Sequence, residues 1–230
     1  MDVKKTMGVS CLEVIKYLVE HLSTLLSAIS VTFVVINFYY LQKHNRESDY
    51  VRLRQDVTTN IVKMVEIHHQ IVYRMRKKSN KENNGLAYLH NLVDEYEEKL
   101  QKSKICDINT DEWENILQEV YNDFFDDNHN QLGQYFRYVY NVFKLIDKSG
   151  LKEDDRQYLS SLYIAQFSGW EYTLLLLNCM FYKKGEKFRE LVFKYRIFEH
   201  MSDKRISKFD KIINKEKGFV YYKNACNKFK

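Results

Sequence analysis

The stretch LSTLLSAISVTFVVINFYYLQ, from Leu22 to Gln42, contains no charged residue in 21 consecutive positions. A helix of about 20 mostly apolar residues crosses the roughly 30 Å hydrocarbon core of a bilayer. Tyr39 and Tyr40 lie near one end, where aromatic rings favour the membrane interface. The run is too long for a signal peptide, and no small-x-small cleavage site follows it. We therefore predict a transmembrane helix over about 22–42, in preference to a signal peptide or a buried core helix.

Small and polar side chains interrupt this span at Ser27, Ser30 and Asn37. In lipid, such residues mediate the association of helices, because they allow close approach and interhelical hydrogen bonds. We expect these three residues to face a neighbouring helix or a wet pore. The protein is thus expected to contact a lipid bilayer and to form a homo-oligomer.

The charges that flank the span give a weak indication of orientation. Lys43, Arg46, Arg52 and Arg54 follow it, and Lys4, Lys5 and Lys16 precede it. The slight excess on the C-terminal side favours a cytoplasmic C-terminal domain under the positive-inside rule. This predicts a single-pass membrane protein whose C-terminal domain is cytoplasmic.

The composition favours long helices in the rest of the chain. The 230 residues include no proline and only 7 glycines, whereas ordinary usage would give about eleven prolines. A proline inside a helix costs about 3 kcal/mol, so its absence permits uninterrupted helices. The 45% hydrophobic and 15% aromatic content argues against disorder. We predict an all-α protein with a membrane-anchoring segment at 1–45 and a cytosolic helical domain at 46–230.

Charge and cysteine usage exclude several functional classes. A net charge of +5, from 36 basic and 31 acidic residues, is too small to indicate a nucleic-acid binder without clustering on one face. RNA remains a candidate partner, but no sequence motif supports it. The cysteines form no CxxC pair and have no zinc-ligand spacing, so we expect reduced thiols, no metal and no cofactor. They are Cys11, Cys106, Cys179 and Cys226.

Apolar residues spaced by three and four predict successive helices after the span. No Gly or Pro occurs from Ser10 to Met75, so the membrane helix is expected to run directly into the next. The run Tyr172 to Tyr182 is nearly long enough for a second span, but Glu171 lies in that window, so we predict a core helix. The expected helices are 48–77, 86–101, one capped by Asn109 or Thr110, 132–147, 154–183, 186–200 and 203–215, with polar breaks at 76–85 and 126–131.

Few residues suggest chemistry. His68 and His69 point about 100° apart on a helix, so we expect one to face the core and one to face solvent, without a metal. The segment 126–131 lacks the spacing of a calcium loop. No nucleophile elbow, P-loop, dinucleotide fingerprint or kinase signature occurs, which favours a protein that is not an enzyme. Arg196 and His200 approach the Arg–His pattern of helical ribonucleases but miss its spacing, so an ordinary surface pair is favoured.

Five motifs, taken in order, resemble the phage abortive infection protein family, the AbiC-like group of bacterial defence proteins. The resemblance extends over roughly residues 20–201. The motifs are IHHQIV (67–72), NGLAYLHNLVDEY (84–96), LGQYFRYVYNVFKLID (132–147), IAQFSGWEYTLLLLNCM (164–180) and GEKFRELVFKYRIFEHM (185–201).

The resemblance implies defence against phage, commonly by halting or killing the infected cell, without a settled biochemical activity. The chain departs from the family pattern at two positions: it has Ile164 where the family often has Arg, and Tyr138 where the family often has His. Polar groups on otherwise apolar helices need buried partners, and we expect Arg137 to pair with Glu171. The resemblance carries over to His68, Gly85, Tyr135, Arg137, Gln166, Glu171 and Tyr195.

These observations lead to three hypotheses. The first is a membrane-anchored effector of abortive infection that oligomerises into a pore or otherwise perturbs the bacterial inner (cytoplasmic) membrane, either alone or as an accessory to an RNA-guided or other defence system. The second is a variant, HEPN-like helical ribonuclease using Arg196 and His200, or Arg137. The third is a membrane-tethered scaffold that recruits a partner protein of another defence system.

Overall fold

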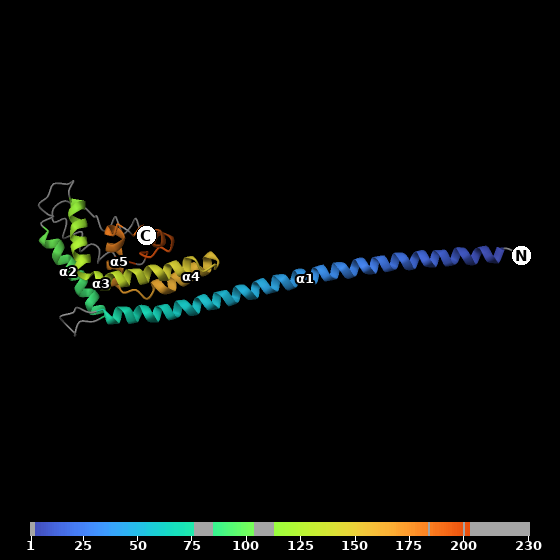
Figure 1. Cartoon of the computed structure of the whole chain (residues 1–230), viewed down its shortest axis with the longest axis horizontal. Helices are drawn as coiled ribbons and strands as arrows, with labels where there is room; N and C mark the ends of the chain where they lie inside the picture. Colours follow the sequence, from blue (N-terminus) through green and yellow to red (C-terminus); the bar gives the residue numbers. More distant parts are fainter. Residues whose placement is uncertain (1–2, 76–84, 104–112, 184, 200, 203–230) are drawn as a thin grey trace. The chain divides into compact units, whose positions relative to one another are not determined.

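The computed structural model describes residues 3–75, 85–103, 113–183, 185–199 and 201–202, and within these ranges the regular structure is entirely helical. The predicted all-α fold is therefore confirmed for the described residues. Figure 1 traces the helices along the chain. They are α1 (Val3–Arg74), α2 (Leu86–Lys102), α3 (Trp113–Asp147), α4 (Glu153–Ile164), α5 (Gly169–Phe181) and α6 (Glu186–Lys194).

The N-terminal helix α1 has no break, so the predicted continuation of the span into the next helix is confirmed. The chain divides into two compact units, Met1–Leu53 and Arg54–Lys230. In the first unit the large apolar side chains of the span are exposed, including Ile29, Phe33 and Phe38. By length and composition, α1 is the one helix of the described residues that could cross a membrane.

In the second unit the core forms around α3, which contacts α2, α4, α5 and α6. Helix α5 is the most deeply enclosed of these helices, because every residue from Glu171 to Cys179 is buried. The prediction that Tyr172–Tyr182 belongs to the core rather than to a second span is therefore confirmed. Cys179 is a buried free thiol, and burial raises its pKa.

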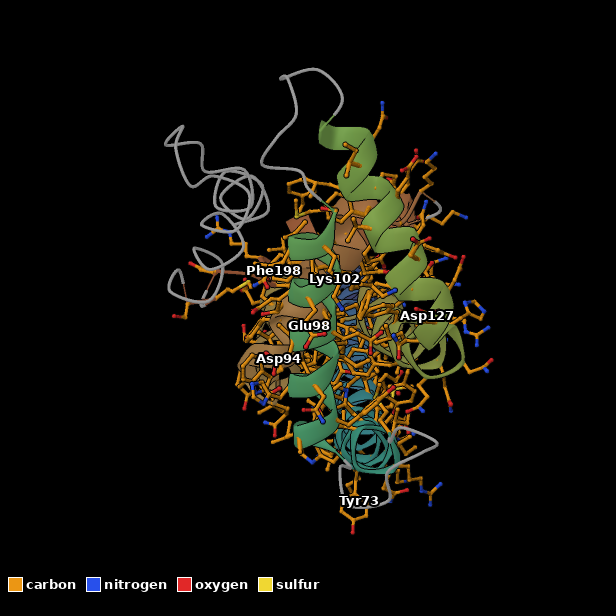
Figure 2. All side chains as sticks on the ribbon, turned by 90° about the vertical axis from the view of Figure 1, so that its left-hand side faces the viewer. Tyr73, Asp94, Glu98, Lys102, Asp127 and Phe198 are labelled. Carbon is orange, nitrogen blue, oxygen red and sulfur yellow. The ribbon has the colours of Figure 1, made fainter. Side chains whose placement is uncertain are left out.

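Helix α2 shows how an amphipathic pattern positions one face against this core. Asp94, Glu98 and Lys102 recur at every fourth position along its outer side, and Figure 2 labels all three. Lys102 and Glu98 form an exposed ion pair at 3.7 Å, a contact that contributes little to stability in water. The opposite face of α2 is buried through Leu89, Leu92, Val93, Tyr96 and Leu100.

The predicted polar break at 126–131 is wrong, because these residues lie inside α3. None of them is Gly or Pro, so nothing in the backbone forces a break. Their polar side chains point to solvent or to polar partners on α2. Asp127 receives Lys99 Nζ at 2.8 Å, and Asn128 Nδ2 donates to Glu95 Oε1 at 3.0 Å. A run of polar residues on the solvent-facing side of a helix therefore gave the same sequence pattern as a loop.

The predicted single helix at 154–183 is also wrong, because α4 ends at Ile164 and α5 starts at Gly169. Ser168 begins α5 with a capping box, in which its Oγ accepts the Glu171 N–H and the Glu171 carboxylate accepts the Ser168 N–H. This reciprocal cap satisfies two donors that a helix start otherwise leaves without partners. The SxxE pattern in the sequence carries this signal.

Other predicted boundaries differ by a few residues or lie outside the described ranges. Helix α2 matches the prediction closely, while α6 ends at Lys194 rather than at 200. Gly85 has a φ of +60°, which favours glycine, and its N–H donates to Met75 O at 3.0 Å. The predicted cap at Asn109 or Thr110, the loop at 76–84 and the helix at 203–215 fall outside the described residues.

Candidate functional site

A buried polar cluster joins α1 to α4 and α5 within the second unit. His68 and Glu171 are 1% and 2% exposed. His68 Nε2 lies 2.7 Å from Glu171 Oε1, and His68 Nδ1 lies 2.9 Å from the Tyr163 hydroxyl. The three side chains come from positions 68, 163 and 171, so the contact exists only in the folded chain.

The Glu171 carboxylate receives two further donors. The Tyr135 hydroxyl, from α3, donates to Oε1 at 3.0 Å. The Ser168 backbone N–H donates to Oε2 at 2.7 Å as part of the cap of α5. Both oxygens of this buried group therefore accept hydrogen bonds, which is the usual condition for burying a carboxylate.

The proton positions follow from these partners. An ionised Glu171 can only accept, so His68 Nε2 carries a proton and donates to it, while Nδ1 pairs with the Tyr163 hydroxyl. Phe167 stacks on the imidazole, with ring centroids 5.4 Å apart. This arrangement satisfies every polar atom of the His68–Glu171 pair.

The electrostatics agree with that assignment. Burial alone would raise the pKa of the Glu171 carboxyl, but the hydrogen bond and charge of His68, together with the Ser168 cap, lower that pKa below its ordinary value. Burial raises the pKa of the Tyr135 and Tyr163 hydroxyls. The carboxyl is therefore ionised and the phenols are protonated at neutral pH, as the network requires.

This cluster is a structural tie rather than a reactive centre, because its atoms are almost fully covered by protein. The prediction that one of the adjacent histidines faces the core is confirmed, since His68 is buried and His69 is exposed. Within the described ranges, no group of three His, Cys, Asp or Glu side chains is placed to hold a metal ion.

The predicted Arg137–Glu171 pair is wrong. Arg137 is exposed, and its Nε donates to Gly133 O at 3.0 Å on its own helix. Glu171 is occupied instead by Tyr135, two residues earlier on α3. Residues two apart point about 200° apart around a helix, so Arg137 must face away from the partner of Tyr135.

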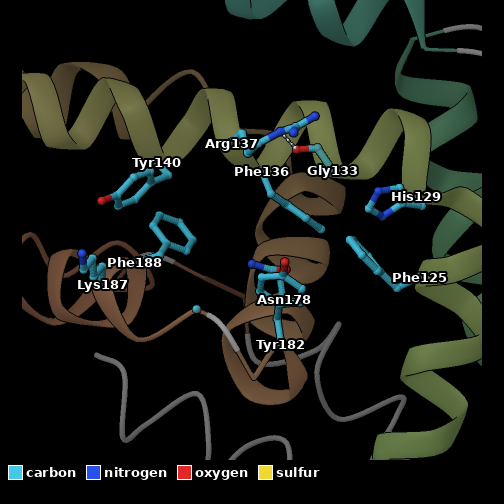
Figure 3. A pocket seen from close by; sticks show the side chains of 11 residues that line it. Phe125, His129, Gly133, Phe136, Arg137, Tyr140, Asn178, Tyr182, Lys187 and Phe188 are labelled. Carbon is cyan, nitrogen blue, oxygen red and sulfur yellow. Dashed lines mark hydrogen bonds between the residues drawn. The ribbon is translucent and has the colours of Figure 1, made fainter.

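Arg137 instead lies at a pocket of about 280 Å³ between α3 and the segment around α5 and α6 (Figure 3). Gly133 and His129 lie one and two turns before it on α3. Lys187 and the buried Asn178 also line the pocket. Its walls are aromatic, and none of the described residues that line it is acidic.

Of the remaining residues that the family resemblance singled out, most make local contacts. Gln166 Nε2 lies 3.4 Å from Leu162 O, one turn earlier. Tyr138 donates its hydroxyl to Met64 O at 2.8 Å. Ile164 is buried, as its apolar character requires. Tyr195 is buried too, and its hydroxyl donates to Asp147 Oδ1 at 3.0 Å.

The Arg196–His200 pair remains a prediction. Arg196 is exposed and has a φ of +49°, just beyond the end of α6. This left-handed backbone ends the regular helical geometry on which the i, i+4 spacing relied. His200 lies outside the described residues.

The residues predicted for helix association lie on one continuous helix in the first unit. Ser27, Ser30 and Asn37 are exposed and fall within an arc of about 80°. Ser30 Oγ donates to Leu26 O at 2.9 Å, which satisfies its proton within the helix.

Together these features describe an all-α protein in which one long helix carries an uncovered apolar span and a buried histidine–glutamate tie anchors the helical bundle. Residues 127–206, about a third of the chain, match the family model described as "Putative phage abortive infection protein". The match confirms the resemblance found in the sequence. No curated protein and no solved structure matches the chain.

The matched segment holds most of the residues that line the pocket and every member of the buried cluster except His68. Arg137, Gln166 and Glu171 lie inside it, and His68 and Gly85 lie outside. Tyr163 and the pocket residues His129, Asn178 and Lys187 were missed by sequence reasoning. Nothing in their local pattern distinguishes them from ordinary core or surface positions.

Proposed function

We propose that this protein is a membrane-anchored effector of abortive infection that acts by self-association in the bacterial inner membrane. The single observation that carries the proposal is the exposure of the whole apolar surface of the 22–42 span. An exposed apolar surface of this extent requires a cover, and a span of membrane length indicates that the cover is lipid. The family match to residues 127–206 supports the defensive role.

Self-association is proposed from the polar arc of the span. In a bilayer, lipid tails cover apolar side chains as well as another helix would, so helices associate through small and polar residues. Ser27, Ser30 and Asn37 lie close enough around the helix to meet an equivalent arc on a second copy. Several such copies would surround a polar lumen and disturb the permeability barrier of an infected cell.

The test changes this arc without shortening the span. A variant with Ser27, Ser30 and Asn37 replaced by Leu keeps the apolar length and removes the polar atoms. Each interhelical polar contact contributes on the order of 1 kcal/mol in lipid. We expect the wild-type protein to be oligomeric in detergent and to depolarise infected cells, and we expect the triple variant to lose both properties.

Thr32 provides a matched control, because it lies about 160° from Ser30 around the same helix. Its Oγ1 already donates to Ala28 O at 2.8 Å. Thr32→Leu should therefore leave oligomerisation and depolarisation unchanged. A wild-type protein that stayed monomeric and never depolarised cells would refute the proposal, and degradation of cellular RNA during infection would favour the ribonuclease hypothesis instead.

Orientation is tested separately. The proposed topology places residues after 45 in the cytoplasm, where a protease added to intact cells cannot reach them. Digestion of that domain in intact cells would contradict the proposed topology and show that the domain lies outside the cytoplasm.

A further inference from the structure

The pocket beside Arg137 combines two chemical features. The first is an aromatic wall. Phe125 stacks on Phe136 with ring centroids 6.3 Å apart and packs against Tyr182 at 5.5 Å, while Tyr140 meets Phe188 edge to face at 6.4 Å. Because these rings hold one another in place, the wall is already formed before a ligand arrives.

The second feature is positive charge at the edge of this wall. Arg137 and Lys187 are exposed, and no ion pair joins either of them to a carboxylate among the residues that the structure describes. Figure 3 shows Arg137 above the pocket and Lys187 at its left-hand side. Arg137 uses its Nε on Gly133 O, and its terminal nitrogens are the groups that bind phosphate oxygens.

The floor adds a polar group of fixed orientation. Asn178 is 4% exposed, and its Oδ1 accepts the Tyr121 hydroxyl at 3.1 Å. With its oxygen on the Tyr121 hydroxyl, the amide has its nitrogen as the end that can donate to a ligand. A fixed amide beside aromatic rings is suited to the polar edge of a planar base.

We propose that this pocket binds a free mononucleotide, with its base against the aromatic wall and its phosphate at Arg137 and Lys187. Aromatic rings stack on bases, and a guanidinium binds phosphate through charge-assisted hydrogen bonds. A volume of about 280 Å³ lies just below the range of about 300–1,000 Å³ for small-molecule sites. Grooves that bind single-stranded nucleic acid follow several nucleotides, so the size favours one nucleotide over a strand.

This proposal goes beyond the membrane function and does not depend on it. It is tested by isothermal titration of the full chain in detergent micelles with AMP, adenosine, inorganic phosphate and a short adenosine oligoribonucleotide. AMP should bind at least about tenfold more tightly than adenosine or phosphate alone, because only AMP engages both features. Membrane depolarisation does not enter this measurement, so failure of either proposal is recognised independently.

Two variants locate the binding. Arg137→Gln should weaken AMP binding about tenfold and leave the weak binding of adenosine unchanged, because only the phosphate contact is lost. Lys63→Gln, at an exposed lysine of α1 in the same unit, should change neither affinity.

Gly133→Trp should abolish AMP binding by filling the pocket. A Cβ at Gly133 would meet the His129 ring at 3.6 Å, an ordinary contact, so the backbone can accept a side chain there. A thermal melt with a wild-type midpoint shows that this variant is folded. Gly133→Ala, which leaves the pocket open, is the matched control and should bind AMP like the wild type. If the tryptophan protein does not fold, the loss of affinity in Arg137→Gln locates the binding.

Absence of AMP binding would overturn the proposal, as would AMP binding that neither Arg137→Gln nor Gly133→Trp weakens. Tighter binding of the oligoribonucleotide than of AMP, with sensitivity to the same variants, would also overturn it and would assign the pocket to RNA.

Discussion

The 22–42 span and α5 are the two most apolar stretches of the chain, and their environments are opposite. Leu26 in the span is 57% exposed, whereas Leu175 in α5 is fully buried. Polar residues in the two stretches differ in the same way. Ser30 and Thr32 bond to their own helix, while Glu171 and Asn178 bond to side chains from other helices. Hydropathy alone therefore does not separate a core helix from a membrane span, but the partners of the polar residues do.

The largest expected effect comes from removing the polar partner in α5. Glu171→Leu would leave the His68 N–H, the Tyr135 hydroxyl and the Ser168 N–H without their acceptor in a dry environment. We expect the free energy of unfolding, measured by denaturant titration in detergent, to fall by about 3–5 kcal/mol.

His69→Ala is the control for this variant, because His69 is the exposed neighbour of His68. It should change stability by no more than about 0.5 kcal/mol. If Glu171→Leu destabilised the protein no more than this control, the cluster would not be the tie described above.

The next prediction applies the same substitution to both stretches. Leu175→Ala should cost about 2–5 kcal/mol, because it leaves a cavity in the core. Leu26→Ala should leave the unfolding of the bundle unchanged, since Leu26 contributes no packing to it. Thermal melts of both variants followed by circular dichroism measure the difference. Equal losses would mean that the span is covered by protein after all.

A smaller effect is expected from the hydroxyl groups. Ser168→Ala removes the side-chain half of the cap of α5 and should cost about 1 kcal/mol. Ser30→Ala removes only a bond within its own helix and should leave the midpoint unaltered. The same melts measure both variants, and a loss in Ser30→Ala as large as in Ser168→Ala would contradict the contrast.

The smallest expected effect is the dependence of stability on pH through the Glu171 carboxyl. The folded state lowers the pKa of Glu171 from its ordinary value of 4.5. A lowered folded pKa means that the stabilisation is present above about pH 4.5 and is lost as the pH falls through the folded pKa. Glu171→Gln should therefore be less stable than the wild type near pH 7, and the difference between them should shrink below pH 4.5. A constant difference across this range would show that the carboxyl is not ionised in the fold.

Much of the fold could be predicted from the sequence, because helical periodicity is a local property. The span, α2 and the buried character of 172–182 follow from spacing and charge alone. The errors arose where local polarity was ambiguous. Residues 126–131 suggested a loop because they are polar, but they are polar because they face solvent and polar partners on α2. The break between α4 and α5 was missed because its signal is a capping box of only four residues, Ser168 to Glu171.

The site was less predictable, because its contacts join distant positions. His68 and Glu171 were both recognised as polar residues on apolar helices, yet 103 residues separate them and no pattern pairs them. Choosing Arg137 as the partner of Glu171 satisfied charge but ignored which face of α3 carries Tyr135. The pocket combines residues from α3, α5 and α6, so its existence follows only from their packing.

The Glu171 side chain has a consequence for the cooperativity of folding, because one of its oxygens makes a local contact and the other makes a long-range contact. Oε2 closes the first turn of α5, and Oε1 holds the imidazole of α1. Fraying of that turn and release of His68 are therefore one event rather than two. An aspartate at this position would be one methylene shorter and could reach only one of the two partners. The length of a single side chain thus couples the start of α5 to the docking of α1.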